Sequence, residues 1–178
     1  FPMRRSLMLL PLLLGGCSCQ RAADDAGRSQ ADTQSTAQSA RDDARRSQQA
    51  LRSATVAALQ SVDADADKPD RVIRNYVDAL LKGSAQASDA FWSGGQRPPR
   101  ADDDLLRDMR DIRAVRVDIE PPYALDPEQA PDLLQANVRV RVTSSEGVHR
   151  FSGYYRLQPA ADGSAWQLYA VSLHAVLD

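Results

Sequence analysis

The sequence predicts an α+β domain in which three helices pack on a curved, mainly antiparallel sheet of four strands. Between residues 68 and 109 the apolar residues recur at helical spacing, whereas from residue 115 onwards they alternate with polar residues, as in half-buried strands. The helical segments all precede the strands, and short turns join most of the strands. This order places the helices on one face of an antiparallel sheet.

The first predicted helix covers residues 68–82. Pro69 suits the first turn of a helix, and Gly83 suits the residue that commonly follows a helix in a left-handed conformation. The apolar side chains that share one face are Val72, Ile73, Tyr76, Val77, Leu80 and Leu81. This face is expected to meet the sheet.

Two shorter helices are predicted next. Ser84 can cap a helix that reaches Phe91-Trp92, and a Gly- and Pro-rich loop follows over residues 93–100. Residues 102–104 are three aspartates, which favour the start of a third helix by capping and by their charge near the helix dipole. Its apolar face would hold Leu105, Leu106 and Met109.

The strand pattern begins at Val115, where apolar and charged residues alternate up to Ile119. Pro121-Pro122 ends this strand, and residues 123–132 are predicted to form a connection without a strand. The second strand has the clearest alternation. Its inward residues are predicted to be Leu134, Ala136, Val138, Val140 and Val142.

Two hairpins complete the predicted sheet. Residues 144–147 form the first turn, and the third strand then directs Phe151, Tyr155 and Leu157 inward. Residues 159–164 form the second turn. The last strand, from Trp166 to about residue 176, is apolar on both sides, which predicts a strand that is covered on both faces.

This order of elements resembles the NTF2-like (cystatin-like cone) superfamily, with PDRVIRNYVDALLKGSAQASDAFW as the opening helix pair. The resemblance covers about residues 68–178. The chain departs from better-known members because it lacks a long strand between the helices and has a Pro-rich break at 121–131. Members include enzymes, ligand binders and scaffolding domains, so the fold alone does not select a function.

The resemblance implies which residues an enzyme of this fold would use. Such enzymes carry an Asp, His or Tyr in the cone, and the candidates here are Tyr76, Tyr155, His149 and Asp89. By strand parity His149 should face inward with Phe151. His174, the other histidine, should share a face with Trp166 and Leu168. No pattern places two of the candidates at hydrogen-bonding distance, which acid–base catalysis requires.

Known catalytic and metal-binding patterns are missing from the sequence. It contains no phosphate-binding glycine loop, no G-x-S-x-G and no H-E-x-x-H. Asp63, Asp65 and Asp67 alternate as at the start of a calcium loop, but the glycine and the closing glutamate are missing. We therefore predict a non-catalytic domain without a cofactor or a metal.

Large aromatic side chains are predicted to face the space between the helices and the sheet. They are Tyr76, Phe91, Trp92, Tyr155 and Trp166. They either fill this space as core residues or line a pocket for a small apolar ligand.

Arginines form the sharpest surface feature. Arg139 and Arg141 share the outer face of one strand, and Arg150 and Arg156 share that of the next. The turn at 144–147 places Arg141 directly opposite Arg150, although like charges opposed across strands are destabilising. This predicts a surface for an acidic partner or an anionic lipid or glycan. The simpler alternative is a solvated face with Asp118 or Glu146 as counter-charges.

The N-terminal segment has the layout of a secretory signal peptide. Phe1-Pro2 precede Met3, which we expect to be the true start, and Arg4-Arg5 supply positive charge. The apolar run from Leu7 to Leu14 is far shorter than the ~20 residues of a membrane-spanning helix. Small glycines then lead to Cys17.

The sequence Leu14-Gly15-Gly16-Cys17 resembles the lipobox of bacterial lipoproteins. The resemblance implies cleavage before Cys17 and acyl chains, such as palmitate, on that cysteine. Several acyl chains give stable membrane anchoring. Ser18 in place of Asp implies the periplasmic face of the outer membrane, if the envelope is Gram-negative. The alternative is a soluble secreted protein with an ordinary signal peptide.

With Cys17 acylated, Cys19 would be the only free thiol, so no internal disulfide is expected.

The predicted organisation is a signal peptide (1–16), a lipid-anchored tether (17–50), a helical stalk (51–67) and the α+β domain (68–178). Residues 18–49 contain no aromatic residue and no Val, Leu, Ile or Met, so disorder is the default and a helix the alternative. A disordered tether of ~30 residues would reach roughly 30 Å. A helix is favoured over about 38–62, where one stripe holds Leu51, Thr55, Leu59 and Val62.

The charge balance excludes one class of ligand. The formal net charge is −2, and removing residues 1–16 takes away two arginines and no acid, which gives −4. This argues against a nucleic-acid or general polyanion binder.

The sequence thus predicts an outer-membrane-anchored periplasmic lipoprotein that serves as a protein-binding or assembly module in the cell envelope. The alternatives are a cone-pocket protein that binds or transforms a small hydrophobic ligand, and an immunity or inhibitor lipoprotein that uses loops 93–104 and 121–132. Its expected partners are the membrane, through the anchor, and an envelope protein. The oligomeric state stays open.

Overall fold

The computed structural model of the chain describes the backbone of residues 22–177 and the side chains of residues 36–84 and 86–177. The predicted lipobox, with Cys17, and Cys19 lie outside the described residues. The chain divides into two units, residues 1–44 and 45–178. None of the helices in the described part is long and apolar enough to cross a membrane.

Helix α1 (Ala22–Gln60) begins earlier than the predicted 38–62. Of the two predicted alternatives for the tether, the helix is the one that residues 22–49 adopt. The many Ala, Gln and Arg residues of this segment have high helix propensity, and Gly27 is its only helix-disfavouring glycine. Helix propensity therefore decides the local conformation even though the segment has few apolar residues.

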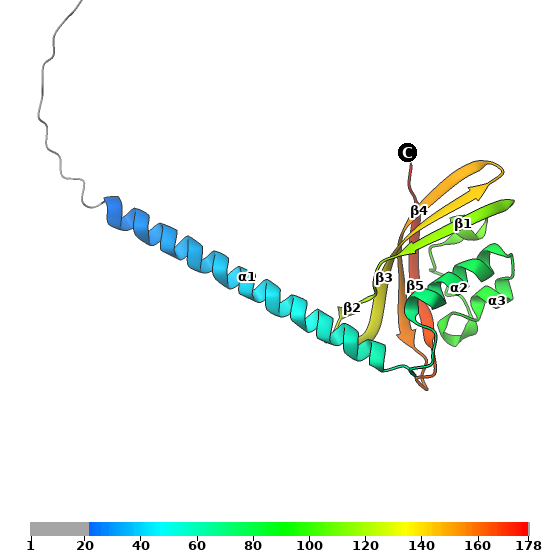
Figure 1. The fold of residues 1–178 in the computed structure, drawn as a ribbon, viewed down its shortest axis with the longest axis horizontal. Coiled ribbons are helices and arrows are strands. Elements are labelled where there is room, and N and C mark those ends of the chain that lie inside the picture. Colours follow the sequence, from blue (N-terminus) through cyan, green and yellow to red (C-terminus); the bar gives the residue numbers. More distant parts are fainter. Residues whose placement is uncertain (1–21, 178) are drawn as a thin grey trace, which may run out of the picture. The chain divides into compact units, whose positions relative to one another are not determined.

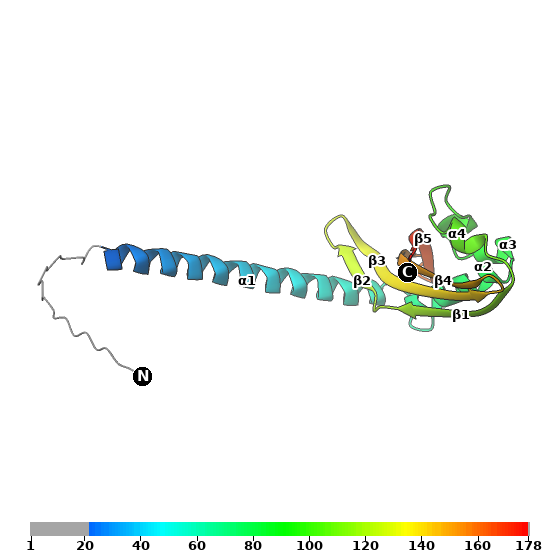
Figure 2. The ribbon, with the colours of Figure 1, turned by 90° about the horizontal axis from the view of Figure 1, so that it is seen from above.

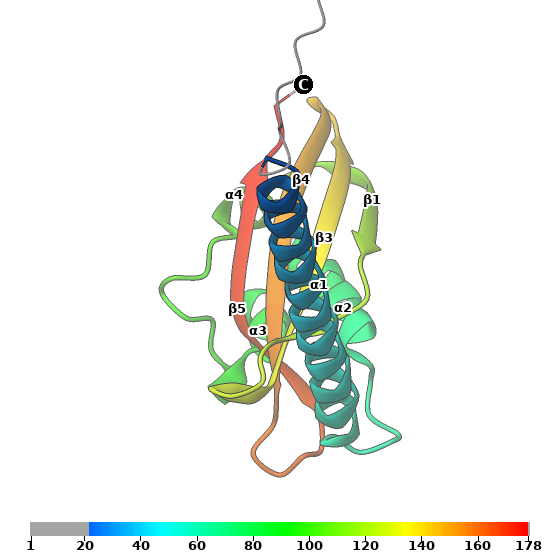
Figure 3. The same ribbon diagram turned by 90° about the vertical axis from the view of Figure 1, so that its left-hand side faces the viewer.

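The unit of residues 45–178 is an α+β domain (Figure 1). After α1 come the helices α2 (Pro69–Leu81), α3 (Ala85–Asp89), the 3-10 turn η1 (Ser93–Gly95) and α4 (Asp104–Arg107). The strands are β1 (Ile112–Ile119), β2 (Tyr123–Asp126), β3 (Ala130–Ser144), β4 (Gly147–Pro159) and β5 (Trp166–Ala175). The antiparallel sheet has the order β1-β3-β4-β5, and β2 pairs with β3 (Figure 3).

The predicted start and end of α2 are confirmed. Pro69 occupies the first turn, and Gly83 follows the helix with φ of 75°. Ser84 caps α3 because its hydroxyl accepts a hydrogen bond from the N–H of Ala87 at 3.3 Å. The six predicted apolar positions of α2 are confirmed as its inward face, except that Leu81 is only partly buried.

The two short helices differ from the prediction. Helix α3 ends at Asp89, before Phe91-Trp92. Asp103 occupies the N-cap position of α4 but makes no capping hydrogen bond. Leu105, predicted on the apolar face of that helix, is 62% exposed, whereas Leu106 is fully buried. A four-residue helix is too short to bury a whole face.

The prediction of four strands is wrong, because the sheet has five. Residues 123–126, predicted as a connection, form the additional strand β2. It folds back on the start of β3, with Ala124 opposite Leu134. The carboxylate of Asp126 accepts hydrogen bonds from the N–H groups of Glu128 and Gln129, both at 3.1 Å, which closes the hairpin. Pro121-Pro122 ends β1 as predicted, but the chain re-enters the sheet directly after it.

Strand β5 is not covered on both faces as predicted. A bulge leaves Tyr169 unpaired, because Leu157 faces Leu168 whereas Arg156 faces Ala170. The bulge reverses the alternation, so Val171 and Leu173 point inward and His174 is exposed. His174 therefore does not share a face with Trp166 and Leu168.

The core lies between the inner sheet face and the helices (Figure 2). The apolar residues and Tyr155 that were predicted to face inward on β3 and β4 are all buried, whereas His149, also predicted inward, is half-buried. The C-terminal part of α1 adds Ala58 to the same core, and Val62, just after the helix, adds another side chain. The Thr55 hydroxyl accepts a hydrogen bond from the N–H of Ala124 at 2.8 Å, which fixes the end of α1 to β2.

Candidate functional site

The outer face of the sheet carries three arginines in one line across three strands. Arg141 lies directly opposite Arg150, as predicted, and Arg116 on β1 lies opposite Arg141 on its other side. We call Arg116, Arg141 and Arg150 the arginine row. The loop between Ser144 and Gly147 has only two residues, so Arg141 and Arg150 form a non-hydrogen-bonded pair, in which side chains lie closest.

The other two predicted arginines have partners of their own. Arg139 forms an ion pair with Glu120 at 3.5 Å, and its side chain is 73% exposed. Arg156 donates a hydrogen bond to Gln135 at 3.1 Å and lies over the ring of Tyr154. The four predicted arginines are therefore not one uniform surface.

Counter-charges neutralise only part of the row. Arg116 Nε lies 3.1 Å from a carboxylate oxygen of Asp118, in an exposed pair that is worth little free energy. The Arg141 side chain is exposed and makes no ion pair or hydrogen bond with the residues that the structure describes. Asp118, one of the two predicted counter-charges, thus pairs with Arg116 of its own strand, which was not among the four predicted arginines, and the centre of the row stays positive.

The interior contains a polar network that the sequence did not predict. The Asp103 side chain is fully buried and accepts two hydrogen bonds from Arg97, from Nε at 3.0 Å and from Nη2 at 2.6 Å. It also accepts a short hydrogen bond from the Tyr76 hydroxyl. Arg107 reaches the same hydroxyl at 3.5 Å and forms an ion pair with Asp89 at 3.2 Å.

Two buried tyrosines, Tyr76 of the network and Tyr155 beside it, are held in their neutral form. Burial, together with the nearby Asp103 carboxylate, raises the pKa of Tyr76 well above its ordinary value. Burial likewise raises the pKa of Tyr155, and the nearby Tyr76 and Asp103 add to this effect. Neither hydroxyl is therefore a ready proton acceptor at neutral pH.

The predicted catalytic candidates are only partly brought together. Tyr76 and Tyr155 pack edge to face with their ring centres 5.7 Å apart, and Asp89 reaches Tyr76 through Arg107. His149 lies apart from them, facing inward beside Phe151 as predicted. Both tyrosines are 0% exposed, so no substrate reaches their hydroxyls in this conformation.

The aromatic residues that were expected either to fill the interior or to line a pocket are mostly packed against one another. The ring of Tyr76 makes edge-to-face contacts with Phe91, Trp92 and Tyr155. Trp92 and Trp166 are 1% and 5% exposed. These contacts favour the filled-core alternative. Tyr155 Oη, Trp92 Nε1 and Arg107 Nε are buried without a hydrogen-bond partner among the described residues.

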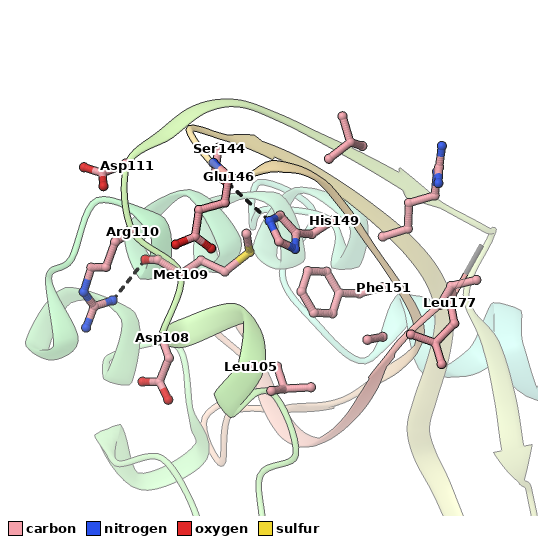
Figure 4. Close-up of a pocket in the computed structure, with 14 residues that line it drawn as sticks. Leu105, Asp108, Met109, Arg110, Asp111, Ser144, Glu146, His149, Phe151 and Leu177 are labelled. Atoms are coloured by element: carbon pink, nitrogen blue, oxygen red, sulfur yellow. Dashed lines mark hydrogen bonds between the residues drawn. The ribbon is translucent and has the colours of Figure 1, made fainter.

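An open groove lies at one end of the domain (Figure 4). It has a volume of about 530 Å³ and runs between the segment 105–111, the β3–β4 hairpin and the end of β5. Phe151 and Met109 supply apolar surface, and His149 Nε2 lies 3.3 Å from the hydroxyl of Ser144. Figure 4 shows His149 between Ser144 and Phe151.

The two loops predicted for an inhibitor are both fixed to the domain. Loop 93–104 is held to α2 by the hydrogen bond from Tyr76 to Asp103, and to β5 by backbone hydrogen bonds of Asp102 with Val171 and Leu173. Loop 121–132 is mostly the β2–β3 hairpin. The sequence analysis did not single out Arg97 or Arg107, and it assigned Asp103 to helix capping. The contacts of Tyr76 with Asp103 and Arg107 span 27 and 31 residues and leave no spacing pattern, and the Arg97–Asp103 contact lies in a loop without a regular period.

No family model, curated protein or solved structure matches this chain. Among the described residues no group of three His, Cys, Asp or Glu side chains could hold a metal ion. The functional assignment therefore depends on the geometry of the sheet face and of the groove.

Proposed function

We propose that this chain is an outer-membrane-anchored periplasmic lipoprotein that acts as a non-catalytic protein-binding or assembly module in the cell envelope. The observation that carries the proposal is the arginine row on the outer sheet face. Opposed like charges cost stability in the free protein. An acidic partner surface would remove that repulsion on binding, which favours the complex and accelerates its formation.

The proposed fold family is the NTF2-like superfamily. Helices on the inner face of an antiparallel, curved sheet support it, as does the confirmed opening helix α2. The short α3 and α4 and the β2 hairpin are the features that distinguish this chain.

The sheet-face proposal predicts the effect of replacing Arg141 and Arg150 together with serine. The double variant should lose most of its acidic partner when the chain is isolated from mildly solubilised envelopes, because the centre of the row is gone. Quantitative mass spectrometry of the co-isolated proteins measures the loss. Raising the salt concentration should weaken capture by the unaltered chain in the same way.

The matched control is Arg71→Ser with Lys82→Ser. It removes the same charge from two exposed positions, one on α2 and one at its C-cap, where each residue forms an (i, i+4) ion pair. Capture that falls equally in both double variants would show a general charge effect, and equal capture in all three proteins would refute the sheet-face proposal.

The anchor proposal predicts a sharp difference between the two cysteines. Cys17→Ser should abolish incorporation of a palmitate analogue and release the chain from the membrane fraction, because the acyl chains have no other attachment site. Cys19→Ser should leave both unchanged. Metabolic labelling with fractionation measures this, and a labelled, membrane-bound Cys17→Ser chain would contradict it.

A small apolar ligand is the second candidate, and the open groove is the observation that favours it. Its apolar surface from Phe151, Met109 and Leu105 lies beside the His149–Ser144 pair. The ligand-binding function ranks second because the aromatic residues that could have lined an interior pocket pack against one another in the core. An immunity or inhibitor lipoprotein would be one form of the binding module.

A further inference from the structure

The two edge strands of the sheet differ in whether other backbone segments hydrogen-bond to them. On the β5 edge, Leu168 N–H donates to Phe91 C=O at 2.8 Å and Leu173 N–H donates to Asp102 C=O at 2.7 Å. These contacts cover that edge with backbone from the loop region. On the opposite edge, β1, no described backbone segment pairs with the strand, and an unpaired edge is a template for another strand.

The direction of the peptide groups of β1 follows from two hydrogen bonds. Glu120 N–H donates to Asn137 C=O on β3 at 2.9 Å, so Arg116 and Asp118, at the same parity, also face β3. Val115, Val117 and Ile119 then present their peptide groups to the open edge. Accordingly, Arg74 from α2 reaches the Val117 carbonyl at 2.7 Å from the side away from β3. That carbonyl keeps a second lone pair.

We infer that β1 is the interface for a second copy of this chain, paired antiparallel about Val117. In this register Arg116 of each copy lies opposite Asp118 of the other, and Val115 lies opposite Ile119. Both charged pairs form on the outer face, and the β-branched pairs form on the inner face. The strand is thus complementary to itself in charge and in shape.

Neighbouring registers lack this complementarity. An antiparallel pair centred on Arg116 places that arginine opposite its own copy, and one centred on Asp118 does the same for the aspartate. Like charges directly opposite each other are destabilising. The charge pattern therefore selects the register centred on Val117, which is also a closed, twofold arrangement.

The surface beside the edge supports the same pairing. Val115 is 39% exposed, which is unusual for an inward-facing valine in a sheet. A pocket of about 470 Å³ lies between β1 and α2, with Val77, Leu81 and Ile112 in its lining. Ile119 of the second copy would lie opposite Val115, beside this pocket, and would bury apolar surface that is otherwise exposed to water.

The pairing goes beyond the proposed function and leaves Arg141 and Arg150 outside the interface, since they lie on β3 and β4. Sedimentation velocity of the full chain in mild detergent, over a range of concentrations, should show a monomer–dimer equilibrium. Arg116→Asp should weaken the dimer about tenfold, because it replaces two attractive pairs with two repulsive ones. Asp118→Arg should do the same, and the double variant with both changes should restore the dimer.

Cysteine cross-linking tests the register directly, in a chain whose Cys17 and Cys19 are replaced by serine. Opposed residues in a non-hydrogen-bonded pair have Cα atoms about 4.5 Å apart, within reach of a disulfide. A mixture of Arg116→Cys and Asp118→Cys chains should therefore form cross-linked dimers, whereas each variant alone should not. Circular dichroism confirms that the variants are folded.

Each other outcome overturns the inference. A chain that stays monomeric at all concentrations has no such interface. A dimer that is insensitive to Arg116→Asp uses another surface, and self-cross-linking of Arg116→Cys or of Asp118→Cys alone identifies a different register.

Discussion

Asp103→Ala is expected to lower the free energy of unfolding by about 3 kcal/mol or more, because it breaks a buried ion pair by removing one partner. The Asp103 side chain is 0% exposed and the Arg97 side chain is 17% exposed. Without the carboxylate, the Tyr76 hydroxyl also loses its acceptor. Arg97 would keep only Asp104 and the Ala101 carbonyl. Urea unfolding followed by tryptophan fluorescence measures the change.

Two further variants at and beside this position make the test specific. Asp102→Ala changes the adjacent carboxylate, which is exposed and accepts one hydrogen bond from Ser172 at 3.2 Å, so a loss of at most about 1 kcal/mol is expected. Asp103→Asn keeps the shape and one acceptor oxygen and should fall between the two. If Asp103→Ala is no more destabilising than Asp102→Ala, the network does not stabilise the fold.

Gly153→Ala is expected to have an equal or larger effect, above about 4 kcal/mol, or to prevent formation of the native sheet. A Cβ atom at this position would lie 1.9 Å from the carbonyl oxygen of Ser172 and 2.9 Å from its carbon. Both atoms belong to the backbone of β5, so no side-chain rotation can relieve the clash. Strands β4 and β5 would have to separate, which would open the core beside Tyr155 and Leu173.

Ser152→Ala is the control for this glycine. Ser152 is the preceding residue of β4 and lies on the outer face, opposite Arg139. Its replacement should change the stability by no more than about 0.5 kcal/mol. Near-ultraviolet circular dichroism and thermal unfolding compare the two variants. Similar unfolding temperatures would contradict a close approach of the strands at Gly153.

The secondary structure that follows from short-range patterns was predictable from the sequence. The amphipathic period of α2, with Pro69 and Gly83 at its ends, depends on neighbouring residues alone. The alternation of Leu134 to Val142 and the short turn before Gly147 fix the β3–β4 register, and this register confirmed that Arg141 opposes Arg150. Two of the three arginines of the row could therefore be predicted.

The errors occurred where a single residue changes the alternation or where a short segment depends on its neighbours. The bulge at Tyr169 inverted the expected position of His174, because alternation is counted along the strand and one extra residue shifts every later side chain. Strand β2 escaped prediction because four residues have too little pattern of their own and are stabilised by pairing with β3.

The sequence by itself determined the α+β class, the long helix α2, the principal β3–β4 hairpin and the arginines that oppose each other on its outer face. Only the tertiary structure decided that Arg116 completes the row, that Asp103 joins Tyr76 to Arg97 in the interior, and that the β5 edge is covered whereas the β1 edge is open. The physical reason is distance along the chain. Helical and strand periods act over a few residues, whereas the Tyr76–Asp103 contact, the third arginine of the row and the sheet edges depend on segments that fold together from distant parts of the sequence.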